Sequence, residues 1–372
     1  RGRRWQLSRR TWVACWPGRR GRGGQETRRR PAMRFGYWMP IFGGWLRNVQ
    51  DEGMPVSWPY IRDLAVASEQ LGFDLSLIAE LNLNDIKGHQ APSLDCWTLA
   101  PAVAAATSTL ELMLAVRPNY HSPSLTAKAL STLDVIAPSR ISLNVVSSWW
   151  KDEAAQYGAP FDVHDARYAR TQEWLDVVGR LLREDNVSHS GPLYELAGTV
   201  LEPKPSRLPP VYMGGESPKA KELIAAQADA YVMHGDAPEV IAAKVADLSA
   251  RRAAAGGSPM TFGVSGYVIC RDTEEEARAE LDRILDVRSS PEAYASYQDF
   301  VEGSQLESQV SLEEYSVSNR GLRSGLIGTP GQIIERLHAY AAAGVDLMLL
   351  QFSPQREEMV RFSRDVISRW PG

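Results

Sequence analysis

From Met33 onward, short apolar runs alternate with longer segments whose apolar residues recur at helical spacing. The run Ile141–Val146 is a clear example of the first kind, because its β-branched residues fit a buried parallel strand. Alternation along that strand puts Ser142 and Asn144 on one face, where a buried hydroxyl and a buried amide need polar partners. The segment Arg167–Arg183 that follows has the apolar spacing of an amphipathic helix.

Eight strand-like and eight helix-like runs alternate along residues 33–372. The strand-like runs are Arg34–Pro40, Phe73–Ala79, Leu110–Val116, Ile141–Val146, Pro210–Met213, Ala230–Met233, Thr261–Cys270 and Asp346–Phe352. The helix-like runs are Trp58–Leu71, Cys96–Ala106, Leu125–Ile136, Arg167–Arg183, Pro218–Gln227, Pro238–Ala255, Glu274–Leu285 and Pro330–Ala343. This alternation predicts an α/β fold, a (β/α)8 TIM barrel, rather than an open sheet. Two insertions, Asn186–Leu208 and Val287–Leu326, lengthen the barrel, and the second has the composition of a lid or binding loop.

The composition is 44% hydrophobic and 23% charged, which is ordinary for a globular protein. No apolar run reaches the roughly 18 residues that a membrane-spanning helix needs. Residues 1–32 differ, with eleven arginines and a single acid, Glu26. A nucleic-acid arm or a twin-arginine export signal would explain this charge, but the apolar stretch of such a signal is cut short at Pro17. We expect residues 1–32 to be a disordered or non-native extension ahead of one domain, residues 33–372.

The net charge and the spacing of the cysteines argue against several classes of function. The whole chain has a net charge of −4 although residues 1–32 are strongly basic, so the remainder is acidic and nucleic acid is not the expected ligand. Cys15, Cys96 and Cys270 lie far apart and give neither a disulfide framework nor a metal-binding spacing. The cysteine usage therefore favours a reducing cytoplasm as the location, and no metal is expected.

Ligands of such barrels bind at the carboxyl ends of the strands, so the residues there are candidates. Gly214 and Gly215 end one strand, and Ser217 opens the next helix, where backbone N–H groups suit a phosphate. The same residues would also make a plain tight turn with Ser217 as the helix cap. Arg167 and Tyr168, at the start of the preceding helix, add a guanidinium and a phenol, which favours the phosphate interpretation.

Other polar residues allow two interpretations each. Asn144 would hydrogen-bond the edge of a heterocycle or be satisfied by the barrel backbone. Glu153, in an expected loop beginning at Lys151, would bind polar ligand edges or be solvated. Arg320, on the second insertion, would meet an anionic substrate or lie in solvent. The candidate general bases, each of which would otherwise be structural, are His121, His164 and His234.

Several motifs stand in the same order as in one known family: Arg117-Pro118, Thr132-Leu133-Asp134, Asn144-Val145-Val146-Ser147, His164-Asp165-Ala166-Arg167-Tyr168, Gly214-Gly215-Glu216-Ser217 and Gly344-Val345-Asp346. On these motifs, residues 33–371 resemble the bacterial-luciferase-like flavin-dependent monooxygenases, and among them the alkanesulfonate and dimethylsulfone monooxygenases. The resemblance implies a luciferase-like TIM barrel that binds FMN, as FMNH2 supplied by an NAD(P)H-dependent flavin reductase. Oxygen (O2) would add to the flavin and give a peroxyflavin that oxidises a small organosulfur compound, an alkanesulfonate or a sulfone.

The resemblance also assigns roles to residues. Arg320 falls where the alkanesulfonate enzymes keep a mobile-loop arginine for substrate and lid closure. A homo-oligomer, a dimer or a tetramer, is implied as well. The cofactor site that the resemblance implies consists of Asn144, Glu153, Arg167, Tyr168, Gly214, Gly215 and Ser217.

The chain departs from the alkanesulfonate enzymes at several positions. It has Ser265 and Tyr267 where they carry an arginine and a histidine, and Ser93 where they carry a cysteine. Their tyrosine near the last strand falls at Phe352 or Ser353. Loss of two cations weakens a sulfonate pocket, so a neutral sulfone or another small uncharged molecule becomes the better expectation. Tyr267 is our candidate for a catalytic hydrogen-bond donor near the reacting oxygen.

Three other functions stay open. The first is an oxidoreductase of the same fold that depends on the deazaflavin F420, which co-purifying F420 would select. The second is a monooxygenase acting on pyrimidine-like rings, which substrate profiling would separate. The third is a non-catalytic flavin-binding protein that stores or carries FMN, and oxygen uptake with reduced flavin and substrate would exclude it.

Overall fold

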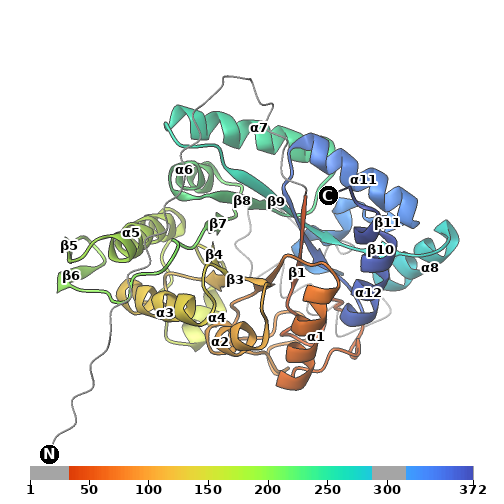
Figure 1. The fold of residues 1–372 in the computed structure, drawn as a ribbon, viewed down its shortest axis with the longest axis horizontal. Helices are drawn as coiled ribbons and strands as arrows, with labels where there is room; N and C mark the ends of the chain where they lie inside the picture. Colours follow the sequence, from red (N-terminus) through yellow and green to blue (C-terminus); the bar gives the residue numbers. More distant parts are fainter. Residues whose placement is uncertain (1–32, 287–315, 372) are drawn as a thin grey trace, which may run out of the picture. The chain divides into compact units, whose positions relative to one another are not determined.

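The computed structural model describes residues 33–286 and 316–371 (Figure 1). The predicted extension, residues 1–32, and residues 287–315 of the second predicted insertion lie outside these ranges. Within the described residues, no helix is both long enough and apolar enough to span a membrane. The same residues contain no group of three or more histidine, cysteine or acidic side chains that could hold a metal ion.

Eight parallel strands close into a barrel in the order β1-β12-β9-β8-β7-β4-β3-β2. The strands are β1 (Arg34–Trp38), β2 (Leu75–Ile78), β3 (Glu111–Val116), β4 (Ile141–Val145), β7 (Val211–Met213), β8 (Ala230–Met233), β9 (Thr261–Tyr267) and β12 (Leu347–Gln351). Each predicted strand-like run contains one of them, so the prediction of a (β/α)8 barrel is confirmed. The strand β12 is buried along its whole length, as expected when a parallel strand is covered on both faces.

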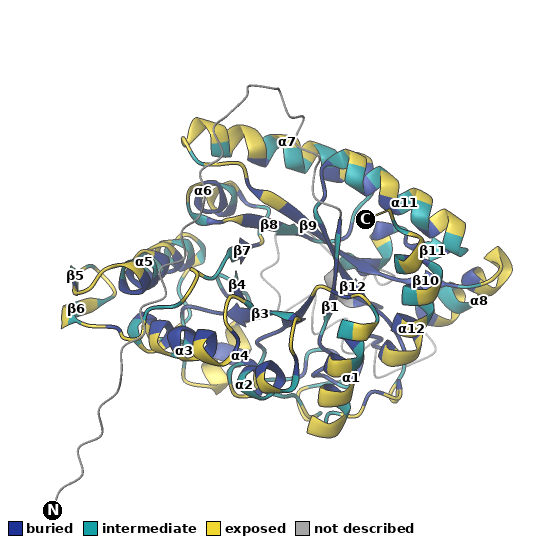
Figure 2. Ribbon diagram, viewed as in Figure 1, coloured by how far each residue is buried: buried dark blue, intermediate teal, exposed yellow. Residues whose placement is uncertain are grey.

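Helices between the strands surround the barrel (Figure 1). Those predicted from the sequence are present as α1 (Trp58–Gln70), α2 (Cys96–Ala106), α3 (Pro123–Ile136), α5 (His164–Arg183), α6 (Pro218–Gln227), α7 (Pro238–Ala254), α8 (Glu274–Leu285) and α11 (Pro330–Ala343). Figure 2 shows exposed residues on their outer sides and buried residues toward the barrel, which is the arrangement that an amphipathic pattern predicts. A further helix, α12 (Gln355–Asp365), follows the last strand; its few apolar residues left it unpredicted.

Two helices differ from the prediction near the barrel mouth. The sequence predicts a loop at Lys151, but α4 (Lys151–Gln156) begins there, and a helix of six residues is too short to reveal an apolar period. The helix α5 begins at His164, ahead of the predicted start at Arg167. The polar residues of this region therefore lie on helices rather than on a loop.

Smaller elements complete the described chain. The first insertion contains an antiparallel hairpin, and the predicted run Thr261–Cys270 is divided between β9 and a separate short strand. The end of the second insertion forms a 3-10 helix that lies against β9. These elements are β5 (Val187–Ser190), β6 (Glu195–Thr199), β10 (Ile269–Cys270), β11 (Ile327–Gly328), η2 (Ser318–Ser324) and η3 (Ile367–Arg369).

Candidate functional site

A cavity of about 350 Å³ lies among the residues that end or follow the barrel strands. Part of its wall is apolar and includes Trp38, Phe42, Trp45, Leu77, Ile86, Trp149 and Met233. The charged part of the wall consists of Arg47, Glu80, Asp85, Arg117, Arg167, Glu216 and Arg320. A cavity that combines apolar and aromatic side chains with converging polar groups is typical of a small-molecule site.

This cavity brings together most of the site residues predicted from the sequence. Those that line it are Asn144, Arg167, Tyr168, Gly214, Gly215 and Arg320. Val146 lines it too, which agrees with the strand face that alternation assigns to Asn144. Glu153, Ser217 and Tyr267 do not line it, although Glu153 and Ser217 contact residues that do.

The turn from β7 to α6 is shaped by its two glycines. Gly215 has a φ of 145°, a backbone conformation that residues with a side chain rarely adopt. A Cβ there would lie 2.6 Å from the Cβ of Ala220. A Cβ on Gly214 would lie 3.0 Å from the carbonyl oxygen of Val232. The cavity is therefore lined here by bare backbone just ahead of the N-terminus of α6, an arrangement suited to an anion.

Ser217 combines the two roles that the sequence left open. Its Oγ accepts a hydrogen bond from the backbone N–H of Ala220 at 3.1 Å and so caps α6. The same hydroxyl donates to the Tyr168 hydroxyl oxygen at 3.4 Å. Because Tyr168 lines the cavity, the cap also fixes the position of a phenol at the site.

Arg167 is almost fully buried near the N-terminus of α5. Its Nη1 donates a hydrogen bond to the carbonyl oxygen of Ser148 at 2.7 Å. Its guanidinium carbon lies 4.9 Å from the ring centroid of Phe161, within the range of a cation–π contact. These contacts hold a positive charge on the cavity wall.

Two buried donors on the cavity wall provide a test of whether a polar ligand fits. The Oγ of Ser148 and the Nε1 of Trp38 are buried and have no hydrogen-bond partner among the described residues. An unmet buried donor costs about 1–3 kcal/mol, so such atoms are expected where a ligand supplies the acceptor. A ligand with oxygen or nitrogen acceptors, such as a flavin, fits this wall.

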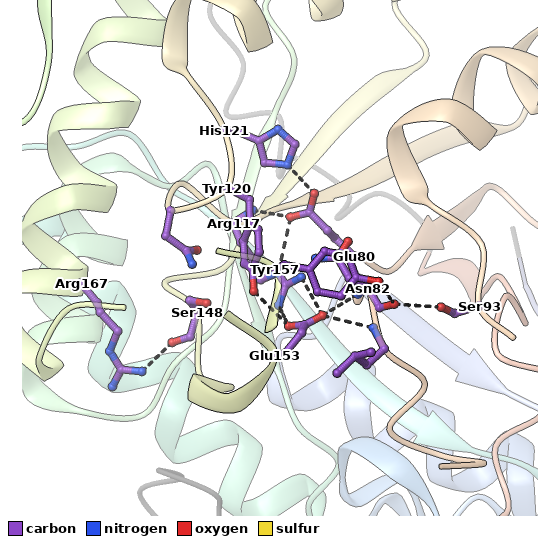
Figure 3. Close-up of polar contacts among 12 residues, drawn as sticks. Glu80, Asn82, Ser93, Arg117, Tyr120, His121, Ser148, Glu153, Tyr157 and Arg167 are labelled. Atoms are coloured by element: carbon purple, nitrogen blue, oxygen red, sulfur yellow. Dashed lines mark hydrogen bonds and ion pairs between the residues drawn. The ribbon is translucent and has the colours of Figure 1, made fainter. Parts of the chain in front are cut away.

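A network of buried charges follows β2 and β3 (Figure 3). Arg117 bonds both carboxylate oxygens of Glu153, and the two side chains are 1% and 0% exposed. Glu153 also accepts hydrogen bonds from the backbone N–H of Asn82 and from the Tyr120 hydroxyl. The structure thus places the Glu153 carboxylate on Arg117, which itself lines the cavity, rather than on the cavity wall.

Glu80 also lines the cavity, although the sequence motifs assign it no role. Its Oε2 accepts a hydrogen bond from the backbone N–H of Arg117 at 2.7 Å, and its Oε1 contacts the Nε2 of His121. These partners lie 37 and 41 residues away along the chain, so no local pattern marks the glutamate. The only available signal was its place at the end of a predicted strand.

Arg320 belongs to η2 and has a positive φ of 51°. Its Nη1 lies 3.2 Å from the Oε2 of Glu216, which also pairs with the Nζ of Lys244 at 2.9 Å. Burial alone would raise the pKa of Glu216, but the ion pair with Lys244 and the charge of Arg320 lower it to about 2. Glu216 is therefore ionised at neutral pH, and Arg320 lies against a full negative charge.

The connection between β1 and α1 supplies another part of the wall. Arg47 pairs with the Asp85 carboxylate at 3.2 Å, and both residues line the cavity. The Nε1 of Trp45 donates to the Oε1 of Gln355 at 2.8 Å, so the indole is held in place from α12. This part of the wall was also missed, because it lies in an irregular connection without a motif.

Tyr267 is 1% exposed and does not line the cavity. Burial raises the pKa of its hydroxyl well above the ordinary value, so the group is neutral. The 3-10 helix η2 covers it, since a Cβ on Gly321 would lie 2.9 Å from the Tyr267 Cβ. Its role beside a reacting oxygen stays a prediction, and the geometry gives it no support, whereas Ser265 of the same strand does line the cavity.

A parallel eight-stranded barrel with an apolar, arginine-bearing cavity at the strand ends defines the class of protein. The chain matches the model of the luciferase-like monooxygenase family over residues 33–347. The protein belongs to this family, which confirms the family resemblance drawn from the motifs.

Within this family, the chain is similar to several individual proteins. An FMNH2-dependent dimethylsulfone monooxygenase of Pseudomonas putida is 36% identical over 348 residues, covering 90% of this chain and 94% of the relative. The protein of the same name from Pseudomonas fluorescens (strain Pf0-1) is 34% identical over 346 residues, with the same coverage of 90% and 94%. Among solved structures, a long-chain alkane monooxygenase gives a TM-score of 0.78 at 21% identity, covering 91% of this chain and 90% of the other. At that identity the structural likeness shows the fold alone.

Proposed function

We propose that the protein is a two-component monooxygenase that receives reduced FMN from a separate NAD(P)H-dependent flavin reductase and uses O2 to oxidise a small neutral sulfone. The relatives at 34–36% identity are named as FMNH2-dependent enzymes of dimethylsulfone. For this chain, the observation that carries the proposal is the pairing of cavity arginines with carboxylates. Association into a dimer or a tetramer stays a prediction.

The residues around the β7–α6 turn suit FMN. Gly214 and Gly215 line the same cavity as Arg167 and Tyr168, so a phosphate would meet backbone N–H groups, a guanidinium and a phenol. Asn144 lines that cavity as well and would hydrogen-bond a polar edge of the flavin ring. When bound, reduced FMN supplies the electrons that reduce O2, so that one oxygen atom enters the substrate and the other leaves as water.

The charges on the rest of the wall favour a neutral substrate. Arg47 lies against Asp85, Arg117 against Glu153, and Arg320 against Glu216. A sulfonate carries a full negative charge and would have to compete with these carboxylates for a cation. A sulfone needs only hydrogen-bond donors for its oxygens and apolar contact for its alkyl groups.

The aromatic wall has the task of keeping water away from the reaction. Trp38, Phe42, Trp45 and Trp149 line the cavity, and Trp149 stacks on Trp150 with ring centroids 5.5 Å apart. Exclusion of water strengthens the polar contacts in the site and prevents reduced oxygen from being lost in side reactions. The protein therefore supplies binding, orientation and dryness, while the electrons come from the cofactor.

A substrate comparison tests this proposal. The full chain is assayed with FMN, NADH and a flavin reductase, using dimethylsulfone or methanesulfonate, and the oxidised product is quantified. We expect kcat/KM for the sulfone to exceed that for the sulfonate at least tenfold, which is about 1.4 kcal/mol of transition-state discrimination. A preference for the sulfonate would contradict the proposed substrate class.

A variant at the ion pair sharpens the comparison. Glu216→Gln removes a negative charge that faces Arg320. We expect the ratio of kcat/KM for methanesulfonate over dimethylsulfone to rise several-fold in this variant, because Arg320 becomes more available to an anion. An unchanged ratio would show that Arg320 does not determine the choice between the sulfone and the sulfonate.

A further inference from the structure

Glu80 and His121 connect the cavity with the surface of the protein. The Oε1 of Glu80 contacts the Nε2 of His121, and Glu80 lines the cavity (Figure 3). The side chain of His121 is 23% exposed, whereas that of Glu80 is 6% exposed. The His121 ring lies 5.2 Å from the ring of Trp97, which fixes one of its faces. A proton can therefore reach a cavity-lining carboxylate from solvent through a single histidine.

Around this pair, buried carboxylates outnumber the guanidinium that faces them. Arg117 makes its two-pronged ion pair with Glu153, and offers Glu80 its backbone N–H at 2.7 Å and its Nε at 3.5 Å. One guanidinium thus faces two buried carboxylates. A proton shared by Glu80 and His121 removes the excess negative charge, and uncompensated buried charge is costly.

The remaining titratable neighbours cannot take over this role. Burial raises the pKa of the Tyr120 hydroxyl, from the β3–α3 connection, to about 12. Burial likewise raises the pKa of the Cys96 thiol, from α2, well above its ordinary value. Both groups stay protonated at neutral pH, whereas an imidazole changes its charge between about pH 5 and 8.

The proposed reaction requires a controlled supply of protons. Oxidation of a substrate S by FMNH2 and O2 gives SO, FMN and H2O, and this equation is balanced. If the reduced flavin enters as the anion FMNH⁻, one proton must come from solvent to complete the water. Tryptophan and phenylalanine form part of the cavity wall, and a proton delivered by a side chain would reach the reaction without admitting bulk water.

We propose that Glu80 and His121 form the proton-exchanging pair of the cavity, in which Glu80 holds the proton at the wall and His121 restores it from solvent. The need for this proton rests on the proposed function. The exchange itself is a property of the two side chains and is measurable without oxygen or substrate.

The direct test is proton uptake on anaerobic binding of FMNH2, followed with an indicator dye in weakly buffered solution near pH 7. An anion bound in the cavity that Glu80 lines would favour uptake of a proton by the pair, so the wild type is expected to take up more protons than either Glu80→Gln or His121→Gln. The matched control is His338→Gln, because His338 also stacks on a tryptophan, at 4.6 Å from Trp370, but belongs to α11. This control is expected to equal the wild type.

The outcomes are distinct. Equal proton uptake in the wild type and both variants, with the melting temperature and oxidised-FMN affinity preserved, overturns the proposal. Because Glu80→Gln and His121→Gln alter different elements, one of them still decides if the other fails to fold. A wild type that takes up the proton but yields no oxidised sulfone contradicts the proposed function and leaves the proton-exchanging pair standing.

Turnover gives a second measurement. At saturating flavin and sulfone, His121→Gln is expected to lower kcat about 10- to 100-fold at pH 7, with KM for the sulfone little changed. Added imidazole is expected to restore part of the rate in His121→Ala, which a purely structural role would not predict. Wild-type kcat in His121→Gln throughout pH 6–8 would contradict the role of His121.

Discussion

Two groups of residues in and behind the cavity wall are built on opposite principles. The turn side presents hydrogen-bond donors and bare backbone; it comprises Arg167, Tyr168, Gly214, Gly215 and Ser217. The charged side is a set of ionisable groups joined by hydrogen bonds and ion pairs. It comprises Glu80, Arg117, Tyr120, His121 and Glu153. The first resembles a receptor for an anion, whereas the second is mostly satisfied before any ligand arrives.

Because of this difference, substitutions on the two sides are expected to affect different properties, ligand binding on one side and folding stability on the other. On the turn side, Arg167 donates a hydrogen bond to a backbone carbonyl oxygen and lies over an aromatic ring, beside the bare backbone of the β7–α6 turn. On the charged side, Arg117 is matched by Glu153, and both are buried. We therefore expect substitutions on the turn side to weaken ligand binding, and substitutions on the charged side to weaken the fold or the control of protons.

The largest effect is expected at Arg117. The substitution Arg117→Met leaves the fully buried Glu153 carboxylate without its cation, which should lower the free energy of unfolding by about 3–5 kcal/mol. The measurement is urea unfolding of the full chain followed by circular dichroism.

A double variant serves as the control for Arg117. Because an apolar pair of similar volume avoids the unpaired charge, Arg117→Met with Glu153→Leu should recover at least half of the lost stability. A double variant as unstable as the single one would show that the pair is not what Arg117→Met breaks.

On the turn side, Arg167→Met is expected to act on binding. Loss of a charged hydrogen-bond donor to a phosphate costs about 1.5–3 kcal/mol, or roughly 10- to 100-fold in Kd for FMNH2. The change in the free energy of unfolding should be clearly smaller than for Arg117→Met. Anaerobic titration and urea unfolding of the same preparation check both expectations, and an unchanged Kd would remove Arg167 from the phosphate site.

The ion pair of Glu216 should be visible in the pH dependence of stability. The pKa of Glu216 falls from its ordinary value of 4.5 to about 2 in the folded protein, so the pair stabilises the fold fully above about pH 4.5. That contribution is lost as the pH falls from 4.5 through 2. The stability difference between the wild type and Glu216→Gln should thus be larger at pH 6 than at pH 3 in urea unfolding. A constant difference would contradict the lowered pKa.

Features that depend on local sequence could be predicted, whereas contacts between distant residues could not. The barrel followed from alternating runs, and Asn144 from strand alternation, because both are local periodic signals. Arg167 followed from its place at a helix start and Gly214 from its place between a strand and a helix, which again is local information. The contact between Glu80 and His121 joins residues 41 apart through a closed sheet, so only the assembled barrel brings it together.

The role of Tyr267 as a hydrogen-bond donor near the reacting oxygen stays a prediction that rests on its alignment position. Tyr267 lies on the predicted strand, but η2 covers it, and its side chain is 1% exposed. The smallest effect is therefore expected for Tyr267→Phe, with kcat for the sulfone within about twofold of the wild type at unchanged flavin affinity. A loss of tenfold or more would restore Tyr267 as a donor to the reacting oxygen.

In the proposed function, the turn side holds reduced FMN for oxygenation of a neutral sulfone. The most direct measurement is anaerobic titration of the protein with FMNH2 and, separately, with reduced F420, followed by mixing with O2 and dimethylsulfone. We expect tighter binding of FMNH2 than of reduced F420, and an oxidised sulfur product that depends on O2. Preferential binding of F420, with no oxygen-dependent product, would contradict the function and leave the barrel fold intact.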